Sequence, residues 1–229
     1  MTRTNTRNRL EETYSRLYES FGPQGWWPAE DRFEVIVGAI LTQSTSWSNV
    51  EKAIGSMRDD RVLSPEGIRK ADSVRLSGLI RSSLYHNAKA RKLKAFVEFM
   101  DREYGGSMEA MMREDAGSLR PRLLSVWGVG PETADSIMLY ALDMPSFVVD
   151  AYTRRIFSRL GLFSDDADYG FMKRFFEDNM DRDVGLYKEY HALIVELGKR
   201  FCRKSRPLCG GCPLHDGCGF MEEPAYTRA

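Results

Sequence analysis

Apolar residues recur at helical spacing along most of the chain, and no alternating strand pattern persists. The stretch from Glu11 to Phe21 stops at Gly22-Pro23, a pair that ends helices. The strongly apolar run from Asp31 to Gln43 is long enough to favour a buried helix over a strand. The same pattern predicts further helices over residues 46–57, 64–71, 86–104 and 117–127. We therefore expect an all-α fold.

Composition narrows the class of protein. The 229 residues suffice for one large domain or two small ones, and 42% of them are hydrophobic, enough for a buried core. Acids and bases balance at 33 each, which argues against positive charge over the whole surface but permits local basic patches. No apolar run approaches a membrane span, and the polar N-terminus lacks the apolar core of a secretion signal. We expect a cytoplasmic location, nucleoid-associated if the source is prokaryotic.

All four cysteines lie within one short segment with the spacing C-x6-C-x2-C-x5-C. They are Cys202, Cys209, Cys212 and Cys218. Both Zn²⁺ and a [4Fe-4S] cluster accept four thiolates, and the spacing alone does not separate them. Unconnected thiols or two disulfides are the alternative, less expected in a reducing compartment.

Basic residues accompany the cysteines. Lys199, Arg203 and Lys204 would sit on the surface of a rigid metal loop, where they suit a phosphate backbone. A solvated run of charge is the alternative.

Residues 118–142 are typical of two helices joined by a tight turn at Gly128 and Gly130. Pro131 fits the first position of the second helix. Free backbone N–H groups at such a turn bind phosphate oxygens without reading base identity. An ordinary helical hairpin would explain the same residues.

Asp150 follows the apolar run Pro-Ser-Phe-Val-Val and precedes a predicted helix. It is expected to cap that helix by accepting a hydrogen bond from the N–H of Thr153 or its neighbour. A carboxylate held near a sugar could also stabilise positive charge as a bond to a base breaks. The two roles are compatible.

Three motifs together resemble one family. They are L-x-x-x-x-G-V-G-x-x-T-A-D (Leu123 to Asp135) followed by V-V-D (Val148 to Asp150), the cysteine spacing, and the segment from Gly38 to Ala53. This combination resembles the helix-hairpin-helix (HhH-GPD) DNA glycosylases of the endonuclease III superfamily.

The resemblance implies a fold of two helical lobes. A six-helix barrel would span residues 29–145, and residues 1–28 with 146–229 would form the lobe that carries the cluster loop. The partner would be double-stranded DNA with a damaged base, bound by a monomer. By resemblance, the cysteines would hold [4Fe-4S] rather than zinc.

The resemblance also assigns roles to residues. Asp150 takes the place of the catalytic aspartate. Gln43, helped by the loop from Ser82 to Ala90, would fill the gap left by a flipped base. DNA contacts are expected from the hairpin residues Gly128, Val129, Gly130 and Thr133.

Glu132 departs from the bifunctional pattern of the family. Bifunctional members carry G-V-G-x-K-T-A, in which the lysine attacks the sugar and forms a Schiff base. Here the sequence is Gly-Val-Gly-Pro-Glu-Thr-Ala, and no lysine occurs between Lys94 and Lys173. A carboxylate cannot form a Schiff base, so we expect a monofunctional glycosylase. Glu132 otherwise suits the first turn of a helix, where the helix dipole favours an acid.

Trp26, Trp27 and Trp47 could form a pocket for the damaged base, together with Gln43. Indole faces attract a cation, and a purine methylated on a ring nitrogen is cationic. The Trp-Trp-Pro and Leu-Thr-Gln-x-Thr-x-Trp arrangements resemble the 3-methyladenine glycosylase branch, which removes alkylated purines without lyase activity. The alternatives are a uracil or thymine mismatch glycosylase, a bifunctional enzyme with a displaced lysine, and a non-catalytic DNA-binding protein.

Overall fold

The computed structural model describes residues 3–27 and 29–222. Over these residues every regular element is helical, which confirms the all-α prediction. Nowhere in the described part is a helix long and apolar enough to cross a membrane. The chain divides into a terminal unit, Met1–Trp26 with Pro145–Ala229, and a central unit, Trp27–Met144.

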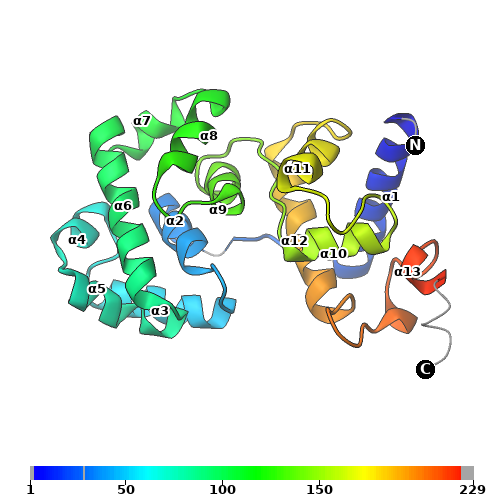
Figure 1. Cartoon of the computed structure of the whole chain (residues 1–229), viewed down its shortest axis with the longest axis horizontal. Helices are drawn as coiled ribbons and strands as arrows, with labels where there is room; N and C mark the ends of the chain where they lie inside the picture. Colours follow the sequence, from blue (N-terminus) through cyan, green and yellow to red (C-terminus); the bar gives the residue numbers. More distant parts are fainter. Residues whose placement is uncertain (1–2, 28, 223–229) are drawn as a thin grey trace. The chain divides into compact units, whose positions relative to one another are not determined.

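The central unit contains a helix, α2, that is buried from its second residue to its last. The unit comprises α2 (Arg32–Leu41), α3 (Trp47–Asp59), α4 (Pro65–Lys70), α5 (Ser73–Leu79), η1 (Arg81–Ser83), α6 (His86–Tyr104), α7 (Met108–Met112), α8 (Ala116–Ser125), α9 (Pro131–Ser136) and the π-helical turn η2 (Ile137–Ala141) (Figure 1). A helix that is apolar all round belongs in a protein interior, and α2 contacts α3, α6, α9 and η2. Asp31 fixes its start by accepting a hydrogen bond from the N–H of Glu34 at 2.8 Å.

The predicted hairpin is present as α8, a turn at residues 126–130, and α9. Gly128 has a φ of +83°, a conformation that favours glycine. A Cβ there would also lie 2.4 Å from Cγ of Lys92, so the turn requires glycine for space as well. Pro131 occupies the first turn of α9, as predicted.

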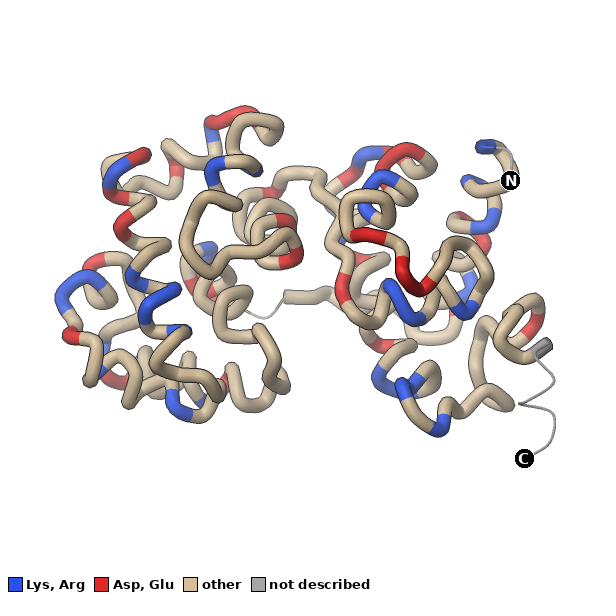
Figure 2. The backbone as a smooth tube through the Cα atoms, in the orientation of Figure 1, with Lys and Arg blue, Asp and Glu red and all other residues tan. Residues whose placement is uncertain are grey.

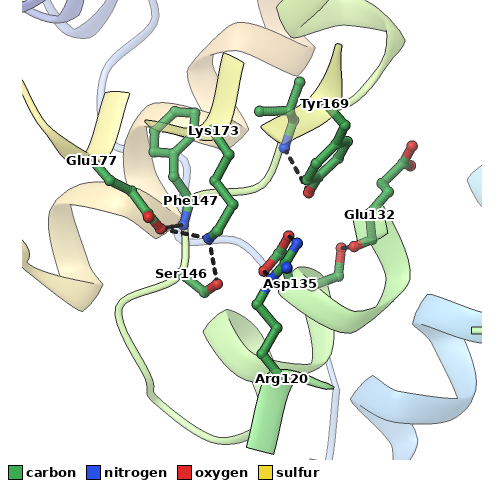
Figure 3. Close-up of polar contacts among 10 residues, drawn as sticks. Arg120, Glu132, Asp135, Ser146, Phe147, Tyr169, Lys173 and Glu177 are labelled. Atoms are coloured by element: carbon green, nitrogen blue, oxygen red, sulfur yellow. Dashed lines mark hydrogen bonds and ion pairs between the residues drawn. The ribbon is translucent and has the colours of Figure 1, made fainter. Parts of the chain in front are cut away.

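A buried ion pair ties the two hairpin helices together (Figure 3). Nε and Nη2 of Arg120 donate to Oδ1 and Oδ2 of Asp135 at 2.8 and 2.9 Å. The Asp135 side chain is fully buried, whereas that of Arg120 is 28% exposed. The pair therefore fixes α8 against α9 and with it the geometry of the turn.

Replacing Arg120 with Met should leave the Asp135 carboxylate buried without this cation. We expect the free energy of unfolding to fall by about 3 kcal/mol, because removing one partner of a buried ion pair is costly. Urea unfolding measures the loss. Arg122→Met on the same helix is the control, since Arg122 pairs with Glu103 and Glu114 at the surface and should matter much less. Equal losses in both variants would contradict the assignment.

The terminal unit is built around aromatic side chains. Its helices are α1 (Arg3–Phe21), α10 (Ala151–Arg159), α11 (Tyr169–Glu177), α12 (Val184–Arg200), η3 (Cys209–Gly211) and α13 (Gly219–Glu222) (Figure 1). Phe147 and Phe176 stack with ring centroids 4.0 Å apart. The Tyr190 hydroxyl donates to the carbonyl of Leu10 at 2.9 Å and joins α12 to α1.

The segment before Asp150 has no regular secondary structure and is held by α11 (Figure 3). Its residues Phe147, Val148 and Val149 are at most 2% exposed. The N–H of Phe147 donates to Oε1 of Glu177 at 2.9 Å, and that of Val149 to the Tyr169 hydroxyl at 3.4 Å. Buried side chains and these contacts fix the backbone that carries Asp150.

Candidate active site

Asp150 caps α10, which confirms the N-cap prediction. Its Oδ1 accepts from the backbone N–H of Thr153 at 2.7 Å and from the Thr153 hydroxyl at 2.9 Å. The residue has an extended backbone, as an N-cap requires. One carboxylate oxygen is therefore fixed by the helix, while Oδ2 takes no part in the cap.

The second oxygen of Asp150 faces His191 of α12. Oδ2 lies 3.6 Å from Nε2 of His191, long for a hydrogen bond but close for opposite charges when the imidazole is protonated. Burial by itself raises the pKa of Asp150. The neighbouring His191 and the Thr153 hydrogen bonds outweigh burial and hold that pKa below its ordinary value of 3.8. The structure thus keeps a fixed negative charge at the start of α10.

Trp26 extends this cluster within the terminal unit. Its ring lies against that of His191, with centroids 5.7 Å apart and planes tilted by 30°. The ammonium of Lys199 lies 5.7 Å from the Trp26 ring centroid. Trp26 is half-buried, so part of its ring is accessible. His191 is the residue that contacts both this ring and Asp150.

Trp27 and Trp47 pack together in the central unit. Their rings meet edge to face at 5.1 Å, and Trp27 also contacts Tyr140 at 5.2 Å. A Cβ on Gly38 would lie 3.0 Å from Trp27, so the indole covers that glycine closely. Of the three tryptophans, the structure groups Trp27 with Trp47 and assigns Trp26 to the other unit. Pro28 of the Trp-Trp-Pro motif lies outside the described residues.

Gln43 is bound to the hairpin turn. Its Nε2 donates to the carbonyl of Gly128 at 3.1 Å and to the hydroxyl of Thr133 at 2.9 Å, and its Oε1 accepts from Lys92. In this state the side chain bridges the end of α2, the turn and α6. To fill a gap in DNA, Gln43 would have to exchange these contacts.

Lys89 connects the two segments that were predicted to plug the gap. Its buried ammonium donates to the carbonyl of Leu41 at 2.8 Å, two residues before Gln43. It also donates to the carbonyl of Ser83, in the loop before α6. Burial, with the nearby charge of Lys92, lowers the pKa of Lys89 to about 8. Lys89 therefore positions both segments from inside the central unit.

The hairpin residues differ in what they expose. Val129 and Thr133 are each 6% exposed, whereas Gly128 and Gly130 are half-buried. Any contact of this turn with a phosphate would therefore be made chiefly by the backbone. Glu132 is exposed in the first turn of α9, where the helix dipole favours it.

The two lysines that bracket this region in sequence are engaged elsewhere. Lys94 donates to the backbone carbonyls of Arg69 and Ala71. Lys173 is 8% exposed, donates to the Ser146 hydroxyl at 2.6 Å and pairs with Glu177 (Figure 3). Both amines already serve structural contacts.

The four cysteine residues border one cavity, together with Arg159, Phe201, His215, Phe220 and Met221. Within the described residues no group of three or more His, Cys, Asp and Glu side chains forms a ready-made metal site. Burial raises the pKa of Cys212 to about 11, and the three other thiols add to this effect. A bound cation would reverse it, since thiolates are the metal ligands. Four thiols around one cavity fit a metal centre.

The predicted basic residues are exposed. Lys199 lies in the last turn of α12, and Arg203 and Lys204 follow in the loop; Figure 2 shows Lys and Arg gathered there. Arg159 fixes this loop by donating to the carbonyls of Arg203 at 2.8 Å and Lys204 at 3.2 Å. The side-chain charges of the loop stay directed to solvent.

The sequence interpretation missed His191 and Lys92. His191 follows the buried Tyr187 by four residues on α12, so helical spacing could have placed it in the interior. Nothing local in the sequence links Lys92 to Gln43, because the contact depends on how α6 packs against the turn.

Comparison with known proteins identifies the family. The model for HhH-GPD superfamily base excision DNA repair proteins matches residues 37–181. A Methanocaldococcus jannaschii protein provisionally named a DNA repair glycosylase is 50% identical over 210 residues, which cover 91% of this chain and 95% of that protein.

Two solved structures are similar over most of the chain. H. pylori 3-methyladenine DNA glycosylase bound to 1,N6-ethenoadenine has a TM-score of 0.71 at 25% identity, covering 87% of this chain and 98% of that one. An endonuclease III trapped in a covalent DNA intermediate has a TM-score of 0.81 at 21% identity, with 97% and 98% covered, and shows the fold alone. On the family match and the identity to the archaeal relative, this chain belongs to the HhH-GPD superfamily of base excision DNA repair glycosylases.

Proposed function

We propose that this DNA glycosylase is monofunctional, flips an alkylated purine such as 3-methyladenine out of duplex DNA, and hydrolyses its N-glycosidic bond. The observation that carries the proposal is the ionised Asp150 fixed at the start of α10. The family supplies the class of reaction.

Asp150 supplies charge rather than a covalent bond. Positive charge develops on the sugar as the base departs, and a fixed carboxylate stabilises it or orients the attacking water. A purine methylated on a ring nitrogen leaves as a neutral base, so the site needs no strong acid. The cap from Thr153 holds Asp150 in place while Oδ2 remains for this role.

Aromatic surfaces support the choice of an alkylated purine. Indole faces attract cations, and Trp26 lies against His191, which in turn faces Asp150 in the terminal unit. The similarity to an H. pylori enzyme named a 3-methyladenine glycosylase supports the same substrate class.

The loop before α6 supports the role of gap filler next to Gln43. Leu84 and Tyr85 are 50% and 70% exposed and have φ values of +60° and +46°. Exposed apolar side chains on strained backbone are typical of functional sites. Base flipping costs a few kcal/mol, which side chains inserted in the stack can offset.

The four cysteines are proposed to hold a [4Fe-4S] cluster, with zinc as the alternative. Bound there, the cluster would cross-link the segment from Cys202 to Cys218. Its contribution is structural, because it would set the loop that carries Arg203 and Lys204.

Base release from a panel of duplexes tests the substrate. The panel carries 3-methyladenine, 7-methylguanine, uracil, a G·T mismatch and oxidised thymine, each with and without alkali. We expect alkylpurine release, with strand breaks only after alkali. Release of uracil or thymine alone would overturn the proposed pocket.

Borohydride trapping tests the absence of lyase chemistry. We expect no covalent adduct with the natural chain, because Glu132 stands where bifunctional relatives carry the attacking lysine. Glu132→Lys is the matched comparison: its side chain is exposed in the first turn of α9, and the variant should give a detectable adduct. Efficient trapping of the natural chain would show that another amine attacks the sugar.

A further inference from the structure

Trp127 stands apart from the three tryptophans of the predicted pocket. It directly precedes Gly128 of the hairpin turn and is 50% exposed. One exposed aromatic residue is common on a protein surface. This one lies at the turn that is expected to bind phosphate.

Arg91 of α6 packs on the Trp127 ring. Its guanidinium carbon lies 4.4 Å from the Trp127 ring centroid, a cation–π contact that orients both groups. Arg91 is exposed and forms no ion pair with any carboxylate that the structure describes. Several other arginines of the central unit do pair with carboxylates: Arg32, Arg58, Arg69, Arg75, Arg120 and Arg122. The charge of Arg91 therefore stays uncompensated beside the turn.

Lys92 fixes where this charge sits. Its stem lies against Gly128, while its ammonium binds Gln43. Two consecutive residues of α6 thus contact two consecutive residues of the turn, Arg91 on Trp127 and Lys92 on Gly128. Such paired contacts leave α6 little freedom to shift relative to the hairpin.

We propose that Trp127 and Arg91 form a clamp for one phosphodiester unit of the DNA strand held by the hairpin. The guanidinium, a planar group with several donors, binds the phosphate, and the indole packs on the adjacent deoxyribose. This inference rests on the proposed function, since it takes DNA as the ligand. The contact is independent of sequence and of the lesion.

Affinity for undamaged duplex, measured by fluorescence anisotropy at several salt concentrations, tests the clamp. We expect Trp127→Ala to weaken binding about threefold, because the cation–π contact that orients Arg91 is lost together with the packing on the sugar. Arg91→Gln should reduce the slope of log K against log salt by about one, because one phosphate contact is lost. Arg113→Gln is the control. Arg113 is an exposed arginine that precedes α8, whereas Trp127 follows α8, and we expect this variant to bind DNA like the natural protein.

Kinetics separate a clamp from a structural role. Trp127→Ala should raise KM and leave kcat and the midpoint of urea unfolding unchanged. The clamp would be overturned if Trp127→Ala bound DNA as tightly as Arg113→Gln does. It would also be overturned if unfolding of Trp127→Ala accounted for its loss of DNA affinity. Failure of the proposed function is distinguishable, because it would appear as absent base release by the natural protein while the affinity ratios still report on Trp127 and Arg91.

Discussion

Replacement of Asp150 with Asn should slow base release about 10³-fold, the upper range for loss of one preorganised electrostatic group. The amide removes the negative charge that the structure maintains beside His191. It preserves the helix start, since an Asn side-chain oxygen also accepts from the N–H of Thr153. The variant therefore tests the effect of the charge on the rate while the structure at the start of α10 is kept.

Single-turnover release of 3-methyladenine is the measurement, with DNA affinity determined in parallel. Asp168→Asn is the matched control, because Asp168 caps α11 of the same unit through the N–H of Phe171 at 2.9 Å. We expect the control to keep its rate and Asp150→Asn to bind DNA at least as tightly as the natural chain. Equal rates for the two variants would remove Asp150 from the mechanism.

The lowered pKa of Asp150 also fixes a pH dependence. Its carboxylate stays ionised above its ordinary value of 3.8, so a decline in rate between pH 7 and 5 would come from another group. A carboxylate whose pKa is lower in the folded chain than in the unfolded chain stabilises the native state at pH values above its unfolded-state pKa. That contribution is lost as the pH falls through the folded-state pKa. The part of acid unfolding due to Asp150 should thus lie below pH 4 and be absent in Asp150→Asn.

Local signals in the sequence sufficed for the hairpin and for the cap. Gly128 and Pro131 have strong backbone preferences, and an Asp between an apolar run and a helix has few local alternatives. The turn and the cap are determined by a few neighbouring residues, so they could be predicted without knowing how the rest of the chain packs.

Local sequence patterns could not predict the contacts between distant segments. Trp26 and Trp27 are adjacent in sequence, yet the boundary between the units falls between them, and they pack against different partners. The pairing of Asp150 with His191 depends on how α10 packs on α12. A sequence pattern gives the face of a helix but not the element that covers it.

Loss of one cysteine should disrupt the loop that follows α12. Cys212→Ser removes one of four thiols around the cavity, and a metal centre with a ligand missing binds far less tightly. Structural metal binding contributes on the order of 10 kcal/mol or more in small zinc-bound folds, so its loss should leave the loop unfolded. The exposed Arg203 and Lys204 would then lose their fixed positions, and DNA affinity should fall.

Metal analysis of the purified chain decides which group is bound. About four irons and four sulfides per chain would support the cluster, and one zinc would support the alternative. The absence of both iron and zinc would contradict a metal centre. Ser205→Ala is the control, because Ser205 is exposed in the same loop and does not border the cavity. We expect it to keep its metal and its DNA affinity. Since the chain has only these four cysteines, no other thiol can replace Cys212, and an unchanged metal content in Cys212→Ser would show that the Cys212 thiol is not a required ligand.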